Sequence, residues 1–156
     1  MSEDTYTEKE FHKKMAVDLF NSVWSFLDKK ERTAEEEDEM VHAAHASRYH
    51  WGQIGSFLEK ERGEWQISRV YSVLKRLQPA LYHAQRCLEI CKENNIGDFD
   101  IAFAYEAMAR AYAVSGEKTE SKKYIELAKK AGNQIENAED KRIFFGDLET
   151  VPGYQE

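Results

Sequence analysis

The sequence has few of the residues that interrupt or cross-link a chain: its 156 residues include only two prolines and two cysteines. Because proline breaks helix interiors, its scarcity leaves long stretches free to be helical. Two cysteines exclude the disulfide framework that holds small secreted domains together, and no second pair completes a zinc site. Cys87 and Cys91 lie four residues apart, on one face of an expected helix. They are therefore interpreted as buried, reduced thiols, in preference to a redox or metal site.

Basic residues and long apolar runs are also scarce. Lysine and arginine number 22 against 29 acidic residues, and the resulting net charge of −7 disfavours a nucleic-acid partner. No apolar stretch approaches the roughly 18 residues of a membrane-spanning helix. The opening stretch MSEDTYTEKE carries acids and no apolar run, which argues against a secretory signal or a membrane anchor. We expect a cytoplasmic protein with no membrane partner and no cofactor.

What the sequence does contain is a helical signal along its whole length. No window alternates polar and apolar residues as a half-buried strand does. Capping boxes opened by Thr7 and Thr33 each place a glutamate three residues later, and Pro79 fits a first helical position. The sequence predicts one all-α domain over 1–149 and a frayed tail over 150–156. The expected helices span roughly 7–29, 34–57, 59–77, 79–94, 99–115, 118–133 and 138–149.

The later helices carry a degenerate repeat. In its clearer copy, one helix holds a large residue, a pair of one apolar and one small residue, and a tyrosine, and the next helix holds small and large residues. A weaker, earlier copy keeps the same internal offsets but has Glu64 where the first large residue belongs. The clearer copy consists of Tyr105, Met108, Ala109, Tyr112, Gly116, Ser121, Ile125 and Ala128, and the earlier one of Ile67, Ser68, Tyr71, Ala80, Ala84 and Cys87.

On these residues the chain resembles the tetratricopeptide-repeat (TPR) family over 62–133, as two degenerate repeats. The spacing departs from that family, since Tyr71 and Tyr112 lie 41 positions apart and the family's repeat is about 34 residues long. The resemblance implies antiparallel helical hairpins in a right-handed α–α superhelix of about seven helices. The helices before the repeats would form an atypical first hairpin, and 138–149 would cap the far end. As a whole, the chain also resembles an uncharacterised bacterial family of short helical proteins, which implies no activity.

One surface of the two repeats combines aromatic and charged residues. On the helix over 59–77, Ile67 and Val70 face the expected core, which leaves Trp65 on the opposite side among arginines. In the TPR family, the equivalent positions of each first helix line a groove that binds extended peptides. The alternative is that another helix, or a second copy of the chain, covers Trp65 and Phe103. The residues that the resemblance assigns to the groove are Arg62, Trp65, Arg69, Phe103, Glu106 and Arg110.

The stretch HAAHASRYHW, which begins at His42, holds three histidines within ten positions. At about 100° per residue, the stretch divides into two faces of one helix. Small residues on one face indicate helix packing, whereas the other face is a polar stripe, and His50 belongs to neither. The packing face holds Met40, Ala43, Ala44, Ser47 and Trp51, and the polar stripe holds Asp38, His42, His45 and Tyr49.

The polar stripe also permits a metal site. Asp38, His42 and His45 offer carboxylate and imidazole groups, which suit zinc or iron when they project from one side of a helix. Metal sites in helical bundles draw further ligands from other helices. The remaining histidines, His12 and His83, have no spacing that predicts their convergence on the stripe. Helix packing, a metal site and contact with a ligand therefore remain three interpretations of this stretch.

Motifs for catalysis are missing. The sequence has no glycine-rich phosphate loop and no Gly-x-Ser-x-Gly elbow, so it predicts no catalytic residues. The interpretation that the residues favour is a binding or scaffolding module that holds a protein or peptide in a TPR-like groove. Two alternatives stay open. One is a metal-dependent helical-bundle enzyme that uses His42 and His45, and the other is a self-associating structural protein that forms a homodimer through its outward aromatic residues.

Overall fold

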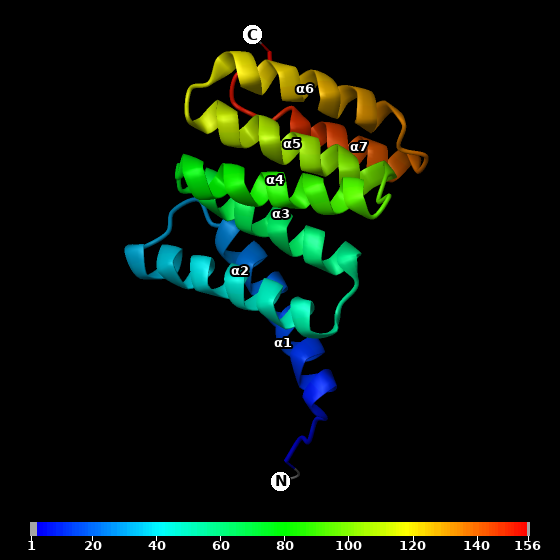
Figure 1. Ribbon diagram of the computed structural model, residues 1–156. Helices are drawn as coiled ribbons and strands as arrows, with labels where there is room; N and C mark the ends of the chain where they lie inside the picture. The colour runs from blue at the N-terminus through cyan, green and yellow to red at the C-terminus, as the bar shows by residue number, and fades with distance from the viewer. Residues whose placement is uncertain (1–2, 156) are drawn as a thin grey trace.

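The computed structural model describes residues 3–155, and in that range the chain forms seven α-helices joined by short turns and no β-strand. The all-α fold expected from the sequence is confirmed (Figure 1). No helix among the described residues is both long enough and apolar enough to cross a lipid bilayer. The helices are α1 (Glu8–Leu27), α2 (Ala34–Ile54), α3 (Phe57–Val73), α4 (Leu77–Glu93), α5 (Asp98–Val114), α6 (Lys118–Asn133) and α7 (Ala138–Leu148).

Local signals set most of the helix starts. The capping boxes expected at Thr7 and Thr33 are confirmed, with the hydroxyl and the glutamate each bonded to a backbone N–H. A third box, opened by Ser56, begins α3 at residue 57, where the sequence had indicated the end of the preceding helix. Pro79 is the third residue of α4 and not the first. The missing N–H of Pro79 costs no hydrogen bond there, because the N–H groups in the first turn of a helix have no acceptor within the helix.

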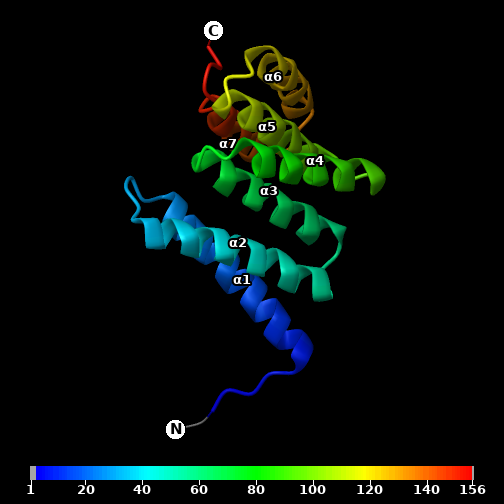
Figure 2. The same cartoon turned by 60° about the vertical axis from the view of Figure 1, so that its left-hand side comes forward.

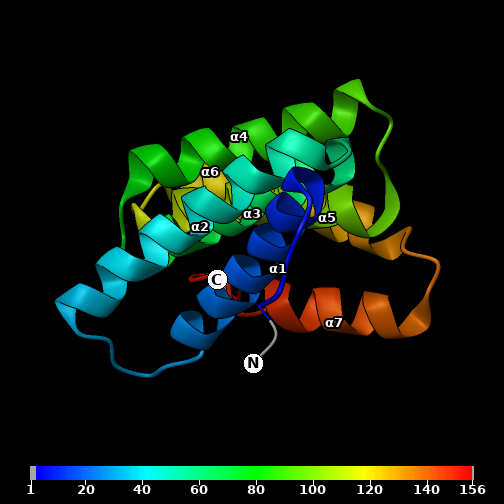
Figure 3. The same cartoon turned by 90° about the horizontal axis from the view of Figure 1, so that it is seen from below.

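The helices form a curved stack. Each helix packs against the next one along the chain, and Figure 2 shows the hairpins following one another from α1 and α2 to α5 and α6. The odd-numbered helices α1, α3, α5 and α7 also contact their odd-numbered neighbours, whereas the even-numbered helices make no such contacts within residues 3–155. Odd-numbered helices therefore lie on the inner side of the curve. Viewed along the stack, α1 and α7 lie on one side and α4 on the other (Figure 3).

Small buried residues bring the helices of each hairpin close together. Alanines with no exposed surface line the contacts, including Ala84, Ala104 and Ala128. In every hairpin, a buried serine hydroxyl donates to a backbone carbonyl of the paired helix and so satisfies its own polar group without water. These bonds join Ser47 to Ala16 (2.7 Å), Ser68 to Ala80 (2.8 Å) and Ser121 to Ala109 (3.0 Å).

The last helix closes the C-terminal end of the core. Phe144 of α7 is fully buried, and its ring lies against Gly132, where a Cβ atom would have no room. The frayed tail expected over 150–156 is wrong for the described residues. Val151 is only 2% exposed and belongs to the same apolar cluster as Phe144, and the partly buried Tyr154 packs against that cluster. The tail is ordered because burying these two side chains offsets the entropy of fixing a short segment.

Candidate binding groove

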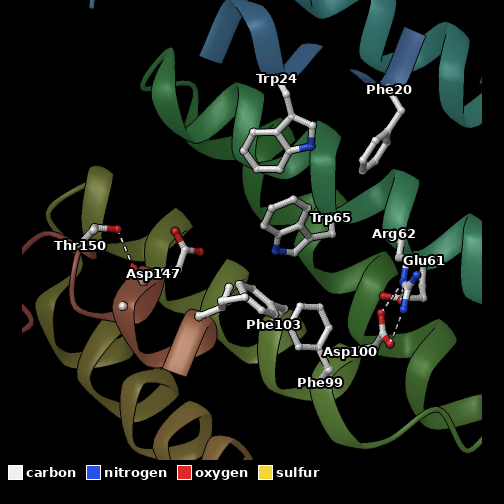
Figure 4. A pocket seen from close by; sticks show the side chains of 12 residues that line it. Phe20, Trp24, Glu61, Arg62, Trp65, Phe99, Asp100, Phe103, Asp147 and Thr150 are labelled. Atoms are coloured by element: carbon white, nitrogen blue, oxygen red, sulfur yellow. Dashed lines mark hydrogen bonds and ion pairs between the residues drawn. The ribbon is translucent and has the colours of Figure 1, made fainter. Parts of the chain in front are cut away.

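A groove of about 620 Å³ lies on the inner side of the curve (Figure 4). It is bounded by α1, α3, α5 and α7 and by Thr150, which follows α7. Volumes of this size are typical of ligand sites. Since α1 and α7 come from opposite ends of the described chain, only the folded stack brings its walls together.

Aromatic rings form the middle of the groove as a continuous chain of contacts. The Trp65 ring lies 5.8 Å from Trp24 and 5.7 Å from Phe103, and Phe103 lies 4.6 Å from Phe99, all measured between ring centroids. The ring of Phe103 also meets that of the buried Phe144 edge to face at 5.0 Å. Such pairs hold each other in place. The groove therefore presents aromatic faces that are already oriented.

Trp65 carries an unsatisfied donor. Its side chain is half-buried, and its Nε1 atom is buried without a hydrogen-bond partner. An indole N–H can only donate, and leaving such a donor buried and unpaired costs about 1–3 kcal/mol. In Figure 4 this nitrogen lies on the side of the ring toward Asp147. A ligand that supplies an acceptor here would recover the cost once a small side-chain movement uncovers this atom.

Four charged residues, of which Asp147 alone lines the groove, lie beside one of its ends, and we call them the groove network. Glu106, which is fully buried, accepts from Arg69 Nη2 at 3.2 Å and from Arg110 Nε at 2.6 Å. Arg69 also pairs with Asp147, and Arg110 donates to the backbone carbonyl of Asp147 at 3.1 Å. Burial by itself lowers the pKa of Arg69, but Glu106 and Asp147 outweigh it and raise that pKa above its ordinary value. The network thus holds two positive and two negative charges that neutralise one another.

The structure places the six expected groove residues in two groups. Arg62, Trp65 and Phe103 line the groove, as the resemblance implied. Glu106, which the resemblance also assigned to the groove, is fully buried, because α7 packs against α5 and brings in Asp147. The sequence could not show this, since it depends on where α7 packs. Arg69, Glu106 and Arg110 belong to the groove network and bond mainly to one another.

The opposite polar end of the groove holds Glu61, Arg62 and Asp100. Arg62 donates to both carboxylate oxygens of Asp100, at 2.8 and 3.1 Å, in a bidentate pair. Glu61 is 1% exposed and accepts a hydrogen bond from the Cys87 thiol at 3.2 Å. Burial above all, and then the neighbouring Asp100 carboxyl, raise the pKa of Glu61 to about 10. Glu61 is therefore a neutral carboxylic acid at physiological pH.

The histidine-rich stretch lies on α2, outside the groove. Its expected packing face is confirmed at Met40, Ala43, Ala44 and Ser47, all of which are buried, while Trp51 is half-buried. The expected polar stripe faces solvent: His42, His45 and Tyr49 are exposed.

A second polar group, which we call the outer cluster, lies between α2, α3 and α4. It consists of His45, Arg48, Glu64, Tyr71 and His83. Glu64 accepts from His83 Nδ1 at 2.6 Å and from Arg48 Nε at 3.2 Å, while His45 Nε2 is 2.8 Å from the Tyr71 hydroxyl. The rings of His45 and His83 lie 5.4 Å apart. Sequence spacing gave no sign of this convergence, because it depends on how far each helix is rotated against the next.

Titration of the outer cluster follows from these contacts. Burial, and then the neighbouring His83, lower the pKa of His45. Burial alone raises the pKa of Glu64, but its contacts with His83 and Arg48 outweigh burial and lower it overall. A second histidine pair, His12 and His50, lies nearby on α1 and α2 with Nδ1 atoms 2.8 Å apart.

Among the described residues, one set of ligand-type side chains is close enough to hold a metal ion, and it differs from the set considered in the sequence. Its ligand atoms, from Glu61, Cys87 and Cys91, lie within 4.8 Å of one another. Asp38, His42 and His45 are not brought together in this way. Both cysteines are buried, as expected, and form no disulfide, but their contact with a carboxyl group was not foreseen.

Comparisons of the chain with protein-family models, with curated proteins and with solved structures give no match. Function is therefore inferred from the groove and its chemistry.

Proposed function

We propose that this protein is a TPR-like binding module that holds a peptide segment of a partner protein in the groove. The observation that carries this proposal is a preformed aromatic groove whose central tryptophan has a buried, unpaired N–H. The ligand that fits is a segment with an aromatic or aliphatic side chain for the rings of Trp65 and Phe103. A backbone carbonyl of the same segment would accept from Trp65 Nε1.

The arrangement of the helices supports a TPR-like superhelix. In that architecture the first helix of each hairpin lines the inner surface, and here α1, α3 and α5 do so, with α7 continuing the series. The right-handed sense of the superhelix belongs to the proposal. Repeat proteins of this kind use their concave surfaces to bind extended partners.

The charges around the groove favour an apolar segment over a strongly charged one. Arg62 is paired with Asp100, and the groove network neutralises itself. A charged ligand would have to break these pairs, whereas an apolar side chain gains by leaving water. Aromatic residues supply a large contact area with little loss of entropy, which is why tryptophan is often a dominant residue at interfaces.

The proposal can be tested by selecting peptides from a displayed random library against the folded full chain. Enriched peptides are then measured by calorimetry against Trp65→Ala, Phe103→Ala and Trp65→Phe. We expect the two alanine variants to weaken binding about thirty-fold or more, since removing a dominant interface residue costs about 2 kcal/mol or more. Trp65→Phe should weaken it less, about two- to ten-fold, because it removes the N–H and part of the ring area but keeps an aromatic face.

Tyr82→Ala is the matched control, because Tyr82 is an aromatic residue of α4 that is 57% exposed and lies outside the groove lining. It should bind the selected peptides as the unaltered chain does. Peptides that bind equally well to Trp65→Ala would contradict the proposal, and so would a selection that enriches none.

The other functions considered from the sequence have weaker support. His42 and His45 are exposed, and neither belongs to a set of ligand atoms close enough to hold a metal among the described residues, so nothing in the structure favours an enzyme that uses them. Self-association into a homodimer stays a prediction, and light scattering after gel filtration would measure it. The cytoplasmic location also stays a prediction.

A further inference from the structure

Two thiols and a carboxyl group converge inside the protein, beside the groove. Cys87 and Cys91 occupy successive turns of α4, and Glu61 reaches them from α3. Both thiols donate to Glu61 Oε2, at 3.2 Å from Cys87 Sγ and 3.5 Å from Cys91 Sγ. All three residues are at most 1% exposed. Glu61 also lines one polar end of the groove, whereas neither thiol does.

The spacing of these atoms suits a tetrahedral ion. Zinc binds thiolate sulfur at about 2.3 Å and carboxylate oxygen at about 2.0–2.2 Å, so a sulfur and an oxygen ligand of one tetrahedron lie about 3.5 Å apart. The two observed distances from sulfur to oxygen fall within a few tenths of an ångström of that value. Small side-chain rotations would therefore be enough to admit an ion.

The burial of Glu61 is only weakly compensated. Among the described residues, no nitrogen or hydroxyl group donates to its Oε1, and the carboxyl group shares a hydrogen bond with the neighbouring Asp100. Burying an acidic side chain costs stability, and an apolar residue of similar size would pack there without that cost. Two thiols are weak donors and compensate for little of it. A bound cation would explain why a carboxyl group occupies this position.

The surroundings provide an access route and outer partners. Glu61 borders the groove, whereas neither cysteine does, so an ion reaching the thiols from the groove passes Glu61. Arg62 Nε lies 3.9 Å from Glu61 Oε1 and is itself held by Asp100. Residues in such outer positions orient metal ligands and balance their charge.

From this geometry we propose that Glu61, Cys87 and Cys91 form a zinc site in which a water molecule or Asp100 supplies the fourth ligand. Thiolate and carboxylate together favour zinc over calcium or magnesium, which prefer oxygen ligands alone. The site gives the protein a cation-binding function separate from its peptide groove. The zinc site and the peptide groove are tested by different experiments, and the result for one does not decide the other.

The test uses the full chain, purified without a histidine tag, reduced, and freed of metal with a chelator. Cobalt(II) is added as a coloured substitute for zinc, and the absorption due to charge transfer from thiolate to cobalt is recorded. We expect this band to saturate at one cobalt per chain and to disappear when one equivalent of zinc is added. Absence of the band would overturn the proposal.

Three variants assign the ligands. Cys91→Ser should remove most of the band. Glu61→Gln should weaken cobalt binding at least about ten-fold, the lower end of the loss found even for residues in the outer shell of a metal site. Glutamine has nearly the same size and shape as glutamic acid, so this variant should stay folded. Circular dichroism checks this. The matched control, His42→Ala combined with His45→Ala, should bind cobalt as the unaltered chain does.

Two outcomes besides a missing band would overturn the proposal. One is a band that survives unchanged in Cys91→Ser or in the folded Glu61→Gln variant. The other is a band that the histidine double variant removes, which would assign the metal to α2.

Discussion

Helix α3 contributes to two charged clusters that differ in kind. The groove network joins Arg69 of α3 to Glu106, Arg110 and Asp147 and is built only from guanidinium and carboxylate groups. The outer cluster joins Glu64 of α3 to Arg48 and to His83, whose ring lies next to that of His45. Groups of the first kind keep their charges near neutral pH, while imidazoles gain or lose theirs.

Because of this difference, the two clusters on α3 have different roles in the fold. The groove network fixes α5 and α7 against α3 at the proposed binding surface through pairs of guanidinium and carboxylate groups. The outer cluster holds α2, α3 and α4 together with contacts that depend on protonation. Stability should therefore respond to acid mainly through the outer cluster, and the groove should keep its shape.

The largest effect is expected from breaking the groove network. Glu106→Ala leaves Arg69 and Arg110 buried with half of their negative partners removed. Loss of one partner from a buried ion pair costs about 3–5 kcal/mol, and we expect the free energy of unfolding in urea to fall by that amount. Glu126→Ala is the control, since Glu126 forms an exposed pair with Lys129, and its loss should not be measurable. Similar results for both variants would show that the network does not stabilise the fold.

A smaller effect is expected from the outer cluster. Glu64→Gln removes a carboxylate that bonds to both Arg48 and His83, and it should lower the free energy of unfolding at neutral pH by about 1–3 kcal/mol.

The same variant has a pH signature. Because the pKa of Glu64 is lowered in the folded protein, its contribution is complete above its ordinary value of 4.5 and is lost as the pH falls from there through the folded-state pKa. The difference in the free energy of unfolding between the unaltered chain and Glu64→Gln should therefore become smaller below that pH. If the difference in the free energy of unfolding between the two proteins stays the same as the pH falls below 4.5, this assignment is contradicted.

The smallest effect should come from His45. Its pKa is lowered in the folded protein, so the unfolded chain takes up the proton first, and stability falls as the pH drops through the ordinary value of 6.5. His45→Gln should flatten this part of the pH dependence, measured by urea unfolding across the histidine range. His42→Gln should alter it much less, because His42 is the weakest of the groups that act on His45. Equal effects of the two variants would contradict the assignment of this pH dependence to His45.

The helical fold could be predicted because its signals are local. Capping boxes at Thr7 and Thr33 and the lack of alternating patterns depend on neighbours in the chain alone. For the same reason the sequence could place Trp65 on the side of α3 opposite Ile67. A single helix wheel is enough for that inference.

The polar contacts could not be predicted, because they depend on how helices are rotated and stacked. Glu61 and Cys87 lie 26 residues apart along the chain, and they meet only because α3 and α4 pair in one particular register. The buried state of Glu106 follows from the position of α7, as does the ordered tail at Val151. From the sequence, a charged residue type such as glutamate is expected to be exposed to solvent. In the folded protein, neighbouring helices bury Glu61 and Glu106 and provide hydrogen-bond partners for them.

The contribution of α7 to the groove has a consequence for synthesis on the ribosome. Ile143, Asp147 and Thr150 form part of the groove wall, so that wall is missing while the hairpins made earlier already begin to fold. Under the proposed function, the emerging chain could not bind a partner at this surface until residue 150 had left the exit tunnel. Binding at the groove would then be confined to molecules in which α7 has been made and has docked.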